Sequence, residues 1–174
     1  MHRPLHATPS QKGNRYAKAE ITQLHGKLCD MYKVPKNFLL LTDGSSEGIR
    51  ALMGAYSRLP KVQLVIPELT YGDGEHFANL YNVPVVKVPM LADWKVDVAG
   101  LKKAVDGFDG FSIVYFVNPN NPTSTVTPAS EIEPWVKSKP DNTLFIADEA
   151  LCGVCQRSEI QIDGRFNSGR AGQR

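Results

Sequence analysis

The sequence is poor in cysteine, in net charge and in long apolar runs. Its three cysteines are few and odd in number, which argues against a disulfide framework and fits a reducing compartment. A formal net charge of +2 does not favour nucleic acid or an anionic membrane as a partner, because both need clustered lysine and arginine. No apolar run approaches the roughly 20 residues of a membrane helix, and residues 1–16 lack the apolar core of a signal peptide. We therefore expect a cytoplasmic protein.

The sequence does contain an alternation of short apolar runs and helical patterns. The apolar runs that predict strands are residues 37–43, 62–67, 83–88, 111–117 and 142–148. The segments with helical spacing of apolar residues are 21–31, 45–58, 72–81, 98–105 and 127–139. In the last helix we expect Thr127 as the cap and Pro128 as the first helical residue. Apolar strands separated by helices predict an α/β fold, a three-layer, mainly parallel sheet with helices on both faces.

Polar residues follow several of these runs, where ligands usually bind in parallel sheets. Ligands sit beyond the carboxyl ends of the strands, because the loops gather there. The polar segments at these positions are residues 43–46, 67–71, 118–124 and 148–149. Each has an ordinary structural explanation when taken alone, since such residues cap helices, pack or make turns. Segment 118–124, NPNNPTS, nevertheless contains more proline and asparagine than one turn requires.

Five motifs in this order carry a resemblance to a known family. They are KGNRY, TDGSSEGIRAL, PELTY, NPNNPT and ADEA, and they span Lys12 to Ala150. Together they resemble the pyridoxal-phosphate-dependent aminotransferases of fold type I, class I/II, and most closely the histidinol-phosphate aminotransferase group. The resemblance implies pyridoxal 5'-phosphate as the cofactor. It also implies amino group transfer between an amino acid or a histidinol-phosphate-like donor and a 2-oxo acid.

The resemblance assigns the first cofactor-binding residues to two loops. Gly44, Ser45 and Ser46 match the loop whose backbone amides hold the cofactor phosphate at a helix N-terminus. Unpaired N–H groups and the positive end of the helix dipole suit an anion there. Tyr71 matches the aromatic residue that stacks on the pyridine ring.

Three further roles follow from the resemblance. Asn121 matches the residue that hydrogen-bonds the 3-oxygen of the ring, so the NPNNPT loop would present it to the cofactor. Asp148 matches the carboxylate that faces the pyridine nitrogen and keeps it protonated, so that the ring accepts electrons from the substrate. Tyr16 matches a tyrosine that reaches the phosphate held by the other subunit, which implies a homodimer.

The chain also departs from the family pattern. The family uses a lysine on a later strand to hold the cofactor as a Schiff base, and no lysine follows Lys139. Leu151 replaces the aromatic residue that commonly follows DEA. We also expect the family's small carboxyl-terminal domain to be missing. We therefore expect a truncated, catalytically incomplete chain. Its parts would be an N-terminal segment at 1–16, a partial cofactor-binding large domain at 17–150 and an irregular tail at 151–174.

Other functions are compatible with single motifs. Gly44–Gly48 satisfies G-x-S-x-G between a predicted strand and a helix, the setting of a serine hydrolase nucleophile. That enzyme needs a histidine late in the chain, and the four histidines are His2, His6, His25 and His76. Cys152–Cys155 forms a C-x-x-C, but no second cysteine pair exists to complete a zinc site, so we predict no metal.

Two questions stay open at the level of sequence. The chain could be a non-catalytic fragment that binds a partner, such as a full-length relative. The amino donor is also undetermined, because the related threonine-phosphate decarboxylases share the same cofactor residues.

Overall fold

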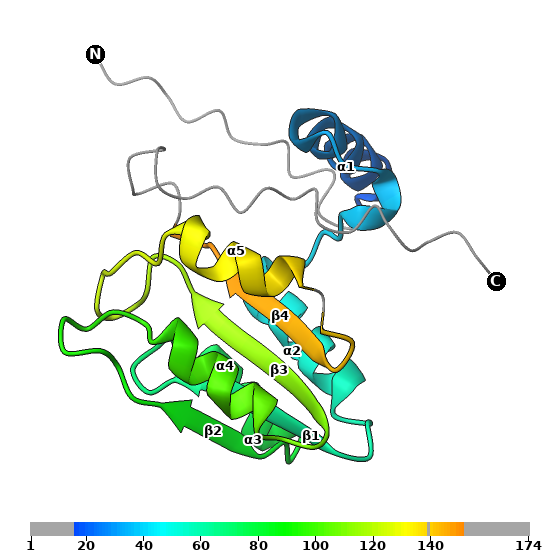
Figure 1. Cartoon of the computed structure of the whole chain (residues 1–174). Coiled ribbons are helices and arrows are strands. Elements are labelled where there is room, and N and C mark those ends of the chain that lie inside the picture. The colour runs from blue at the N-terminus through cyan, green and yellow to red at the C-terminus, as the bar shows by residue number, and fades with distance from the viewer. Residues whose placement is uncertain (1–15, 139, 152–174) are drawn as a thin grey trace. The chain divides into compact units, whose positions relative to one another are not determined.

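Four parallel strands form a sheet in the second of two compact units. The computed structural model describes residues 16–138 and 140–151, and the units divide between Leu41 and Thr42. The strands are β1 (Val62–Pro67), β2 (Val85–Val88), β3 (Phe111–Val117) and β4 (Thr143–Asp148). Their order is β2-β1-β3-β4, and every neighbouring pair is parallel (Figure 1). The predicted parallel sheet is confirmed.

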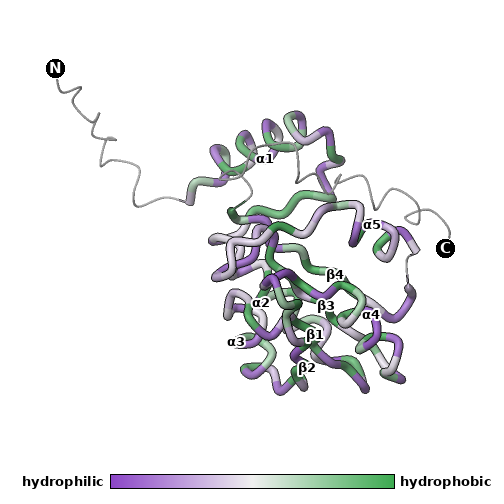
Figure 2. The backbone as a smooth tube through the Cα atoms, turned by 60° about the vertical axis from the view of Figure 1, so that its left-hand side comes forward, coloured by the Kyte–Doolittle hydropathy of each residue, from purple (hydrophilic) through white to green (hydrophobic). Residues whose placement is uncertain are grey.

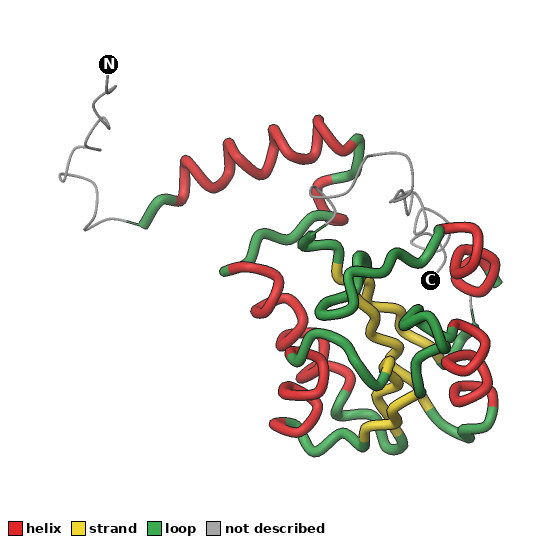
Figure 3. Tube along the Cα trace, turned by 90° about the vertical axis from the view of Figure 1, so that its left-hand side faces the viewer, coloured by secondary structure: helices red, strands yellow, loops and turns green. Residues whose placement is uncertain are grey.

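Helices cover both faces of this sheet. They are α2 (Gly44–Tyr56), α3 (Asp73–Leu80), α4 (Val98–Asp106) and α5 (Ala129–Lys137). Buried side chains of α2 and α3 pack against one face, and those of α4 and α5 pack against the other. Figure 3 shows the strands between the two groups of helices. The predicted three-layer α/β fold is confirmed.

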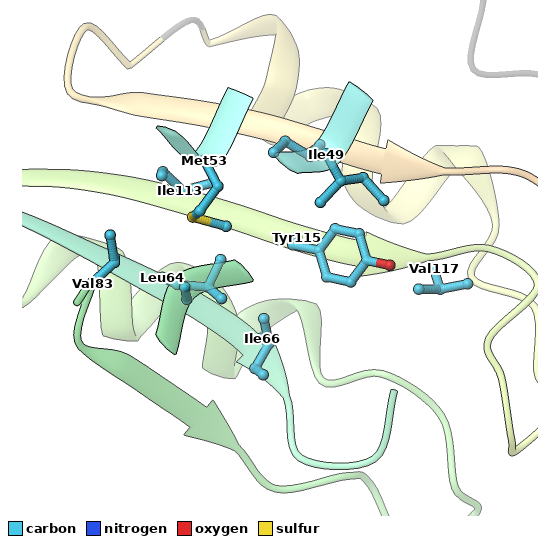
Figure 4. Close-up of a cluster of buried hydrophobic side chains, with 10 residues drawn as sticks. Ile49, Met53, Leu64, Ile66, Val83, Ile113, Tyr115 and Val117 are labelled. Atoms are coloured by element: carbon cyan, nitrogen blue, oxygen red, sulfur yellow. The ribbon is translucent and has the colours of Figure 1, made fainter. Parts of the chain in front are cut away.

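The core consists of two apolar clusters, one on each face of the sheet. The cluster under α2 and α3 includes Ile49, Met53, Leu64, Ile66, Ile113, Tyr115 and Val117 (Figure 4). The cluster under α4 and α5 includes Val65, Leu101, Val105, Val114, Phe116, Ile132 and Trp135. Neighbouring residues of β1 and β3 alternate between the clusters, which explains why these strands are apolar apart from Gln63 and Ser112, which bond to each other (Figure 2).

The first unit contains helix α1 (Lys18–Tyr32) and a short 3-10 helix, η2 (Lys36–Phe38). The helix ends at Lys33, whose left-handed backbone has a φ of 54°. The imidazole of His25 donates a hydrogen bond to the carbonyl of Leu39 over 3.0 Å, which joins the helix to the segment after η2. The helix predicted from the spacing of residues 21–31 is confirmed.

The strand predicted at residues 37–43 is wrong. The segment begins within η2, and its remaining residues pair with no strand of the described residues. Leu39 has extended dihedral angles, but the side chain of Leu40 is 76% exposed. An apolar run alone therefore does not make a strand, because a strand also needs a neighbour that accepts its backbone hydrogen bonds.

The predicted start of the last helix is also wrong. Helix α5 begins at Ala129, with Pro128 in the N-cap position and no side-chain cap. Thr127 lies before the helix, and both its backbone N–H and its carbonyl are bonded to the side chain of Asn118. A tertiary contact thus fixes Thr127, and the helix begins two residues later.

No helix in the described ranges is both long and apolar enough to cross a membrane.

Candidate functional site

The predicted site segments of the second unit lie at the carboxyl edge of the sheet. The strands are parallel, so the segments after β1, β3 and β4 leave the sheet at the same edge. Helix α3 begins at this edge, since only residues 68–72 separate it from the end of β1. Its first residue, Asp73, accepts a hydrogen bond from Ser46 in the first turn of α2. The Ser46 Oγ to Asp73 Oδ2 distance is 2.5 Å. The N-termini of α2 and α3 are therefore neighbours.

Hydrogen bonds also join the three loops that follow β1, β3 and β4. Thr70 donates through its hydroxyl to the side-chain oxygen of Asn120 over 2.9 Å. The amide of Asn120 donates to the carbonyl of Leu69 over 2.9 Å. The backbone N–H of Asn118 donates to the carbonyl of Asp148, also over 2.9 Å. The structure thus brings the loops of Tyr71, Asn121 and Asp148 together.

The first turn of α2 presents backbone N–H groups without a side-chain cap. Gly44 has a φ of +78°, in the left-handed region that favours glycine. The side chain of the N-cap residue Asp43 makes no hydrogen bond to the first turn. The backbone N–H of Asp43 itself donates to the side chain of Glu47 over 2.6 Å. First-turn amides have no acceptor within their own helix. The amides of Ser45 and Ser46 can therefore hold an anion.

The hydroxyl of Ser46 donates to a carboxylate, whereas in a phosphate site it would donate to the phosphate. Its proton goes to Asp73, so it is not available for donation to a phosphate in this arrangement. Ser46 therefore contributes its backbone amide to an anion site, while its side chain ties α2 to α3.

We predict that Ser46→Ala leaves phosphate-dependent binding of pyridoxamine 5'-phosphate within about twofold, since the amide remains. The same change should lower the free energy of unfolding by about 1 kcal/mol, the usual contribution of one hydrogen bond. Calorimetric titration and urea unfolding would measure the two effects. A large loss of affinity with unchanged stability would show that the hydroxyl itself binds the ligand.

The loop between β3 and α5 is held by two asparagines. The amide of Asn118 donates to the carbonyl of Thr127, and its oxygen accepts from the N–H of Thr127, both over 2.9 Å. Asn120 is buried and also donates to Thr123 over 2.8 Å. Asn121, by contrast, is exposed. The peptide bonds Asn118–Pro119 and Asn121–Pro122 are both cis. The extra asparagines therefore build the loop that presents Asn121.

Asp148 ends β4 as a buried carboxylate with two hydrogen-bond donors. Its side chain belongs to a residue only 7% exposed. The phenol of Tyr115 donates to Oδ2 over 3.1 Å, and the backbone N–H of Ala150 donates to Oδ1 over 3.1 Å. Burial, followed by the charge of Asp148, raises the pKa of the Tyr115 phenol well above its usual value. The phenol is therefore protonated and a donor at neutral pH.

Glu149, the next acid, has no comparable set of partners. Its Oε1 atom is buried without a hydrogen-bond partner among the residues described here, and burial raises the pKa of its carboxyl. No group of three or more histidine, cysteine, aspartate or glutamate side chains in these ranges could hold a metal ion. The chemistry of the edge therefore centres on Asp148.

Three predicted features remain, namely Tyr16, Tyr71 and the C-x-x-C motif. Tyr16 belongs to the first unit, where its side chain is fully exposed, and its contact with a second subunit stays a prediction. Tyr71 lies in the loop after β1 and is partly exposed. The Cys152–Cys155 motif lies outside the described residues.

Sequence reasoning missed Tyr115 and Asp73. Tyr115 lies within an apolar strand, where a tyrosine is normally attributed to packing. Its position two residues before the strand end could have been noticed, because residues two apart in a strand share a face. Asp73 follows PELTYG, and only the pairing of two helix starts reveals its role.

Comparison with known proteins decides the family. The sequence profile of the class I and II aminotransferases matches residues 1–167. The chain belongs to this family.

The aminotransferase relatives are longer than this chain. It is 30% identical over 135 residues to the histidinol-phosphate aminotransferase of Symbiobacterium thermophilum, covering 78% of this chain and 36% of the relative. A solved structure of a candidate histidinol-phosphate aminotransferase from Erwinia carotovora atroseptica is 52% identical, with a TM-score of 0.84. That match covers 89% of this chain and 44% of the other. The chain therefore spans less than half the length of these relatives.

A third relative was solved with the cofactor. The histidinol-phosphate aminotransferase from Sinorhizobium meliloti, in complex with pyridoxal-5'-phosphate, is 26% identical with a TM-score of 0.69. The match covers 84% of the 174-residue chain described here and 39% of the Sinorhizobium chain. The architecture is accordingly that of the fold type I aminotransferases.

Proposed function

We propose that the residues at the carboxyl edge of the sheet bind pyridoxal 5'-phosphate, as part of an aminotransferase that acts on a histidinol-phosphate-like donor. The observation that carries the proposal is Asp148, a buried carboxylate at the same edge as the open first turn of α2. Its two donors, the phenol of Tyr115 and the N–H of Ala150, are neutral, and a buried carboxylate is stabilised further by a cationic partner. A protonated pyridine nitrogen would be such a partner.

The residues present fit the chemical groups of this cofactor. Its phosphate needs N–H donors, which the amides of Ser45 and Ser46 offer at the N-terminus of α2. Its ring nitrogen needs an acceptor, which the carboxylate of Asp148 offers. Its 3-oxygen needs a donor, which the exposed amide of Asn121 offers from the adjoining loop.

Each side chain would then contribute one step to the chemistry. When bound, pyridoxal phosphate supplies a protonated ring that withdraws electrons from the α-carbon of the substrate. Asp148 holds the proton on the ring nitrogen, because a nearby carboxylate favours the charged form. Asn121 orients the ring through its 3-oxygen. Tyr71 packs against the ring face and excludes water from it.

We further propose that these 174 residues alone bind the cofactor without transaminating. The sequence holds no lysine beyond Lys139, so none follows β4 to bond the cofactor covalently and move the proton at the α-carbon. The amino donor is proposed from the relatives. A homodimer in the cytoplasm, with Tyr16 reaching the partner's phosphate, is proposed from the family pattern.

The purified chain tests this proposal in two assays. Pyridoxamine 5'-phosphate should bind saturably in a calorimetric titration, and it is the preferred probe because it has no aldehyde to react with surface lysines. Conversion of histidinol phosphate and 2-oxoglutarate should stay at the rate of a protein-free control. Turnover above that control would disprove the catalytic incompleteness, and absence of saturable binding would disprove the cofactor site.

No observation favours the serine hydrolase. The Ser46 hydroxyl of the G-x-S-x-G motif donates to the carboxylate of Asp73, not to an imidazole. A serine nucleophile needs an adjacent base that removes its proton, and histidine serves this purpose in the G-x-S-x-G hydrolases.

A further inference from the structure

We propose that Tyr115 is a positioning residue, which fixes the carboxylate of Asp148 so that its remaining lone pairs face the ring nitrogen of the cofactor. The inference rests on the cofactor site proposed above and adds a residue to it. Tyr115 itself does not touch the ring in this assignment. It acts through Asp148.

The register of the sheet places the two side chains on one face. Tyr115 pairs with Ile146, and Val117 pairs with Asp148. Tyr115 is thus the diagonal neighbour of Asp148, within reach of a long aromatic side chain. Figure 4 shows the Tyr115 oxygen pointing along β3 toward Val117, the carboxyl end of the strand, and it meets Asp148 Oδ2 at 3.1 Å.

Helix α3 locks the ring of Tyr115 in this position. A Cβ atom added to Gly74 would lie 2.4 Å from Cδ1 and 2.8 Å from Cε1 of the ring, distances that no real contact allows. The backbone of α3 therefore rests directly on the ring. Tyr115 is 0% exposed, so its phenol has no other place to go.

The two donors leave part of the carboxylate available. An ionised carboxylate has about four lone-pair directions, and here the phenol of Tyr115 and the N–H of Ala150 each occupy one. With one donor on each oxygen, the carboxylate cannot rotate without breaking a bond. A fixed acceptor binds a ring N–H better than one that must first be ordered.

Removal of the phenol oxygen tests the proposal. Tyr115→Phe should weaken binding of pyridoxamine 5'-phosphate by roughly 5- to 20-fold, less than the full worth of a hydrogen bond to a charged group, because the N–H of Ala150 still holds Asp148. Binding of the 1-deaza analogue, in which carbon replaces the ring nitrogen, should change less than about twofold, since Asp148 has no N–H to accept from it. Calorimetric titration of the full chain gives both constants.

A matched variant and a double variant control the experiment. Tyr56 packs against the same apolar cluster as Tyr115, and its ring stacks on Phe111 with 5.2 Å between the ring centroids. Tyr56→Phe also removes a phenol oxygen, but it should leave the binding constants of both ligands unchanged. Tyr115→Phe made in an Asp148→Asn background should cause no further loss. An additive loss would show that Tyr115 acts independently of Asp148.

The outcomes separate this inference from the proposed function. If the wild-type chain binds pyridoxamine 5'-phosphate no more tightly than its deaza analogue, the role of Asp148 fails, and that of Tyr115 with it. If the wild type distinguishes the two ligands and Tyr115→Phe distinguishes them equally well, only the role of Tyr115 fails. Equal weakening of both ligands would mean that Tyr115 merely supports the fold.

Discussion

Replacing Asp148 with asparagine is expected to weaken binding of pyridoxamine 5'-phosphate by roughly 10- to 100-fold. The wild-type carboxylate accepts a charge-assisted hydrogen bond from the protonated ring nitrogen, and such bonds are worth about 1.5–3 kcal/mol. Asparagine has no charge and offers only one oxygen acceptor. That oxygen can still accept from the N–H of Ala150, while the phenol of Tyr115 can rotate to accept from the new amide. Thermal unfolding should therefore change far less than binding.

The measurement is a calorimetric titration of wild type and Asp148→Asn, with Asp109→Asn as the control. Asp109 is an exposed aspartate in the segment before β3, where it pairs with Lys61 over 3.0 Å. Its replacement also removes one negative charge, but at the opposite edge of the sheet, so affinity should stay within about twofold of wild type. Equal effects of both variants would mean that only net charge matters and would remove Asp148 from the site.

The sheet was predictable because its strands are recognisable locally. Residues 62–67 and 111–117 are apolar except for Gln63 and Ser112, and both are strands with side chains buried on two faces. The run at 37–43 has a similar composition but no partner strand in the described part of the chain. Pairing is a property of the whole fold, so composition alone could not separate the two cases.

The candidate site was predictable in its residues but not in its connections. The resemblance pointed to Asp148, which ends β4, and to the first turn of α2, which the hydrogen bond from Ser46 to Asp73 joins to the start of α3 at the same edge. The Tyr115 phenol could not be connected with Asp148 without knowledge of the register between β3 and β4. A slip of one residue in this register would turn the side chains of one strand to the other face. The bond from Ser46 to Asp73 likewise depends on how two helices meet.

Asn118 and Asn121 each precede a proline in the same loop, yet we expect their alanine variants to fail in different ways. Asn118 is 1% exposed and bonds both the N–H and the carbonyl of Thr127. Asn118→Ala leaves these two backbone groups without partners in a buried place, which should lower the free energy of unfolding by about 2–4 kcal/mol. For a chain of this length the melting temperature should fall by roughly 5–15 °C.

Asn121→Ala should leave the melting temperature within about 2 °C, because an exposed side chain contributes little to stability. Its effect should appear in the titration with pyridoxamine 5'-phosphate as a roughly 3- to 10-fold loss of affinity, since the donor to the 3-oxygen is gone. Thermal unfolding and titration of both variants give four values. If Asn121→Ala melted as low as Asn118→Ala with unchanged affinity, Asn121 would be another structural asparagine. The opposite pattern, stability lost at Asn118 and affinity lost at Asn121, would show that one asparagine builds the loop so that the other meets the cofactor.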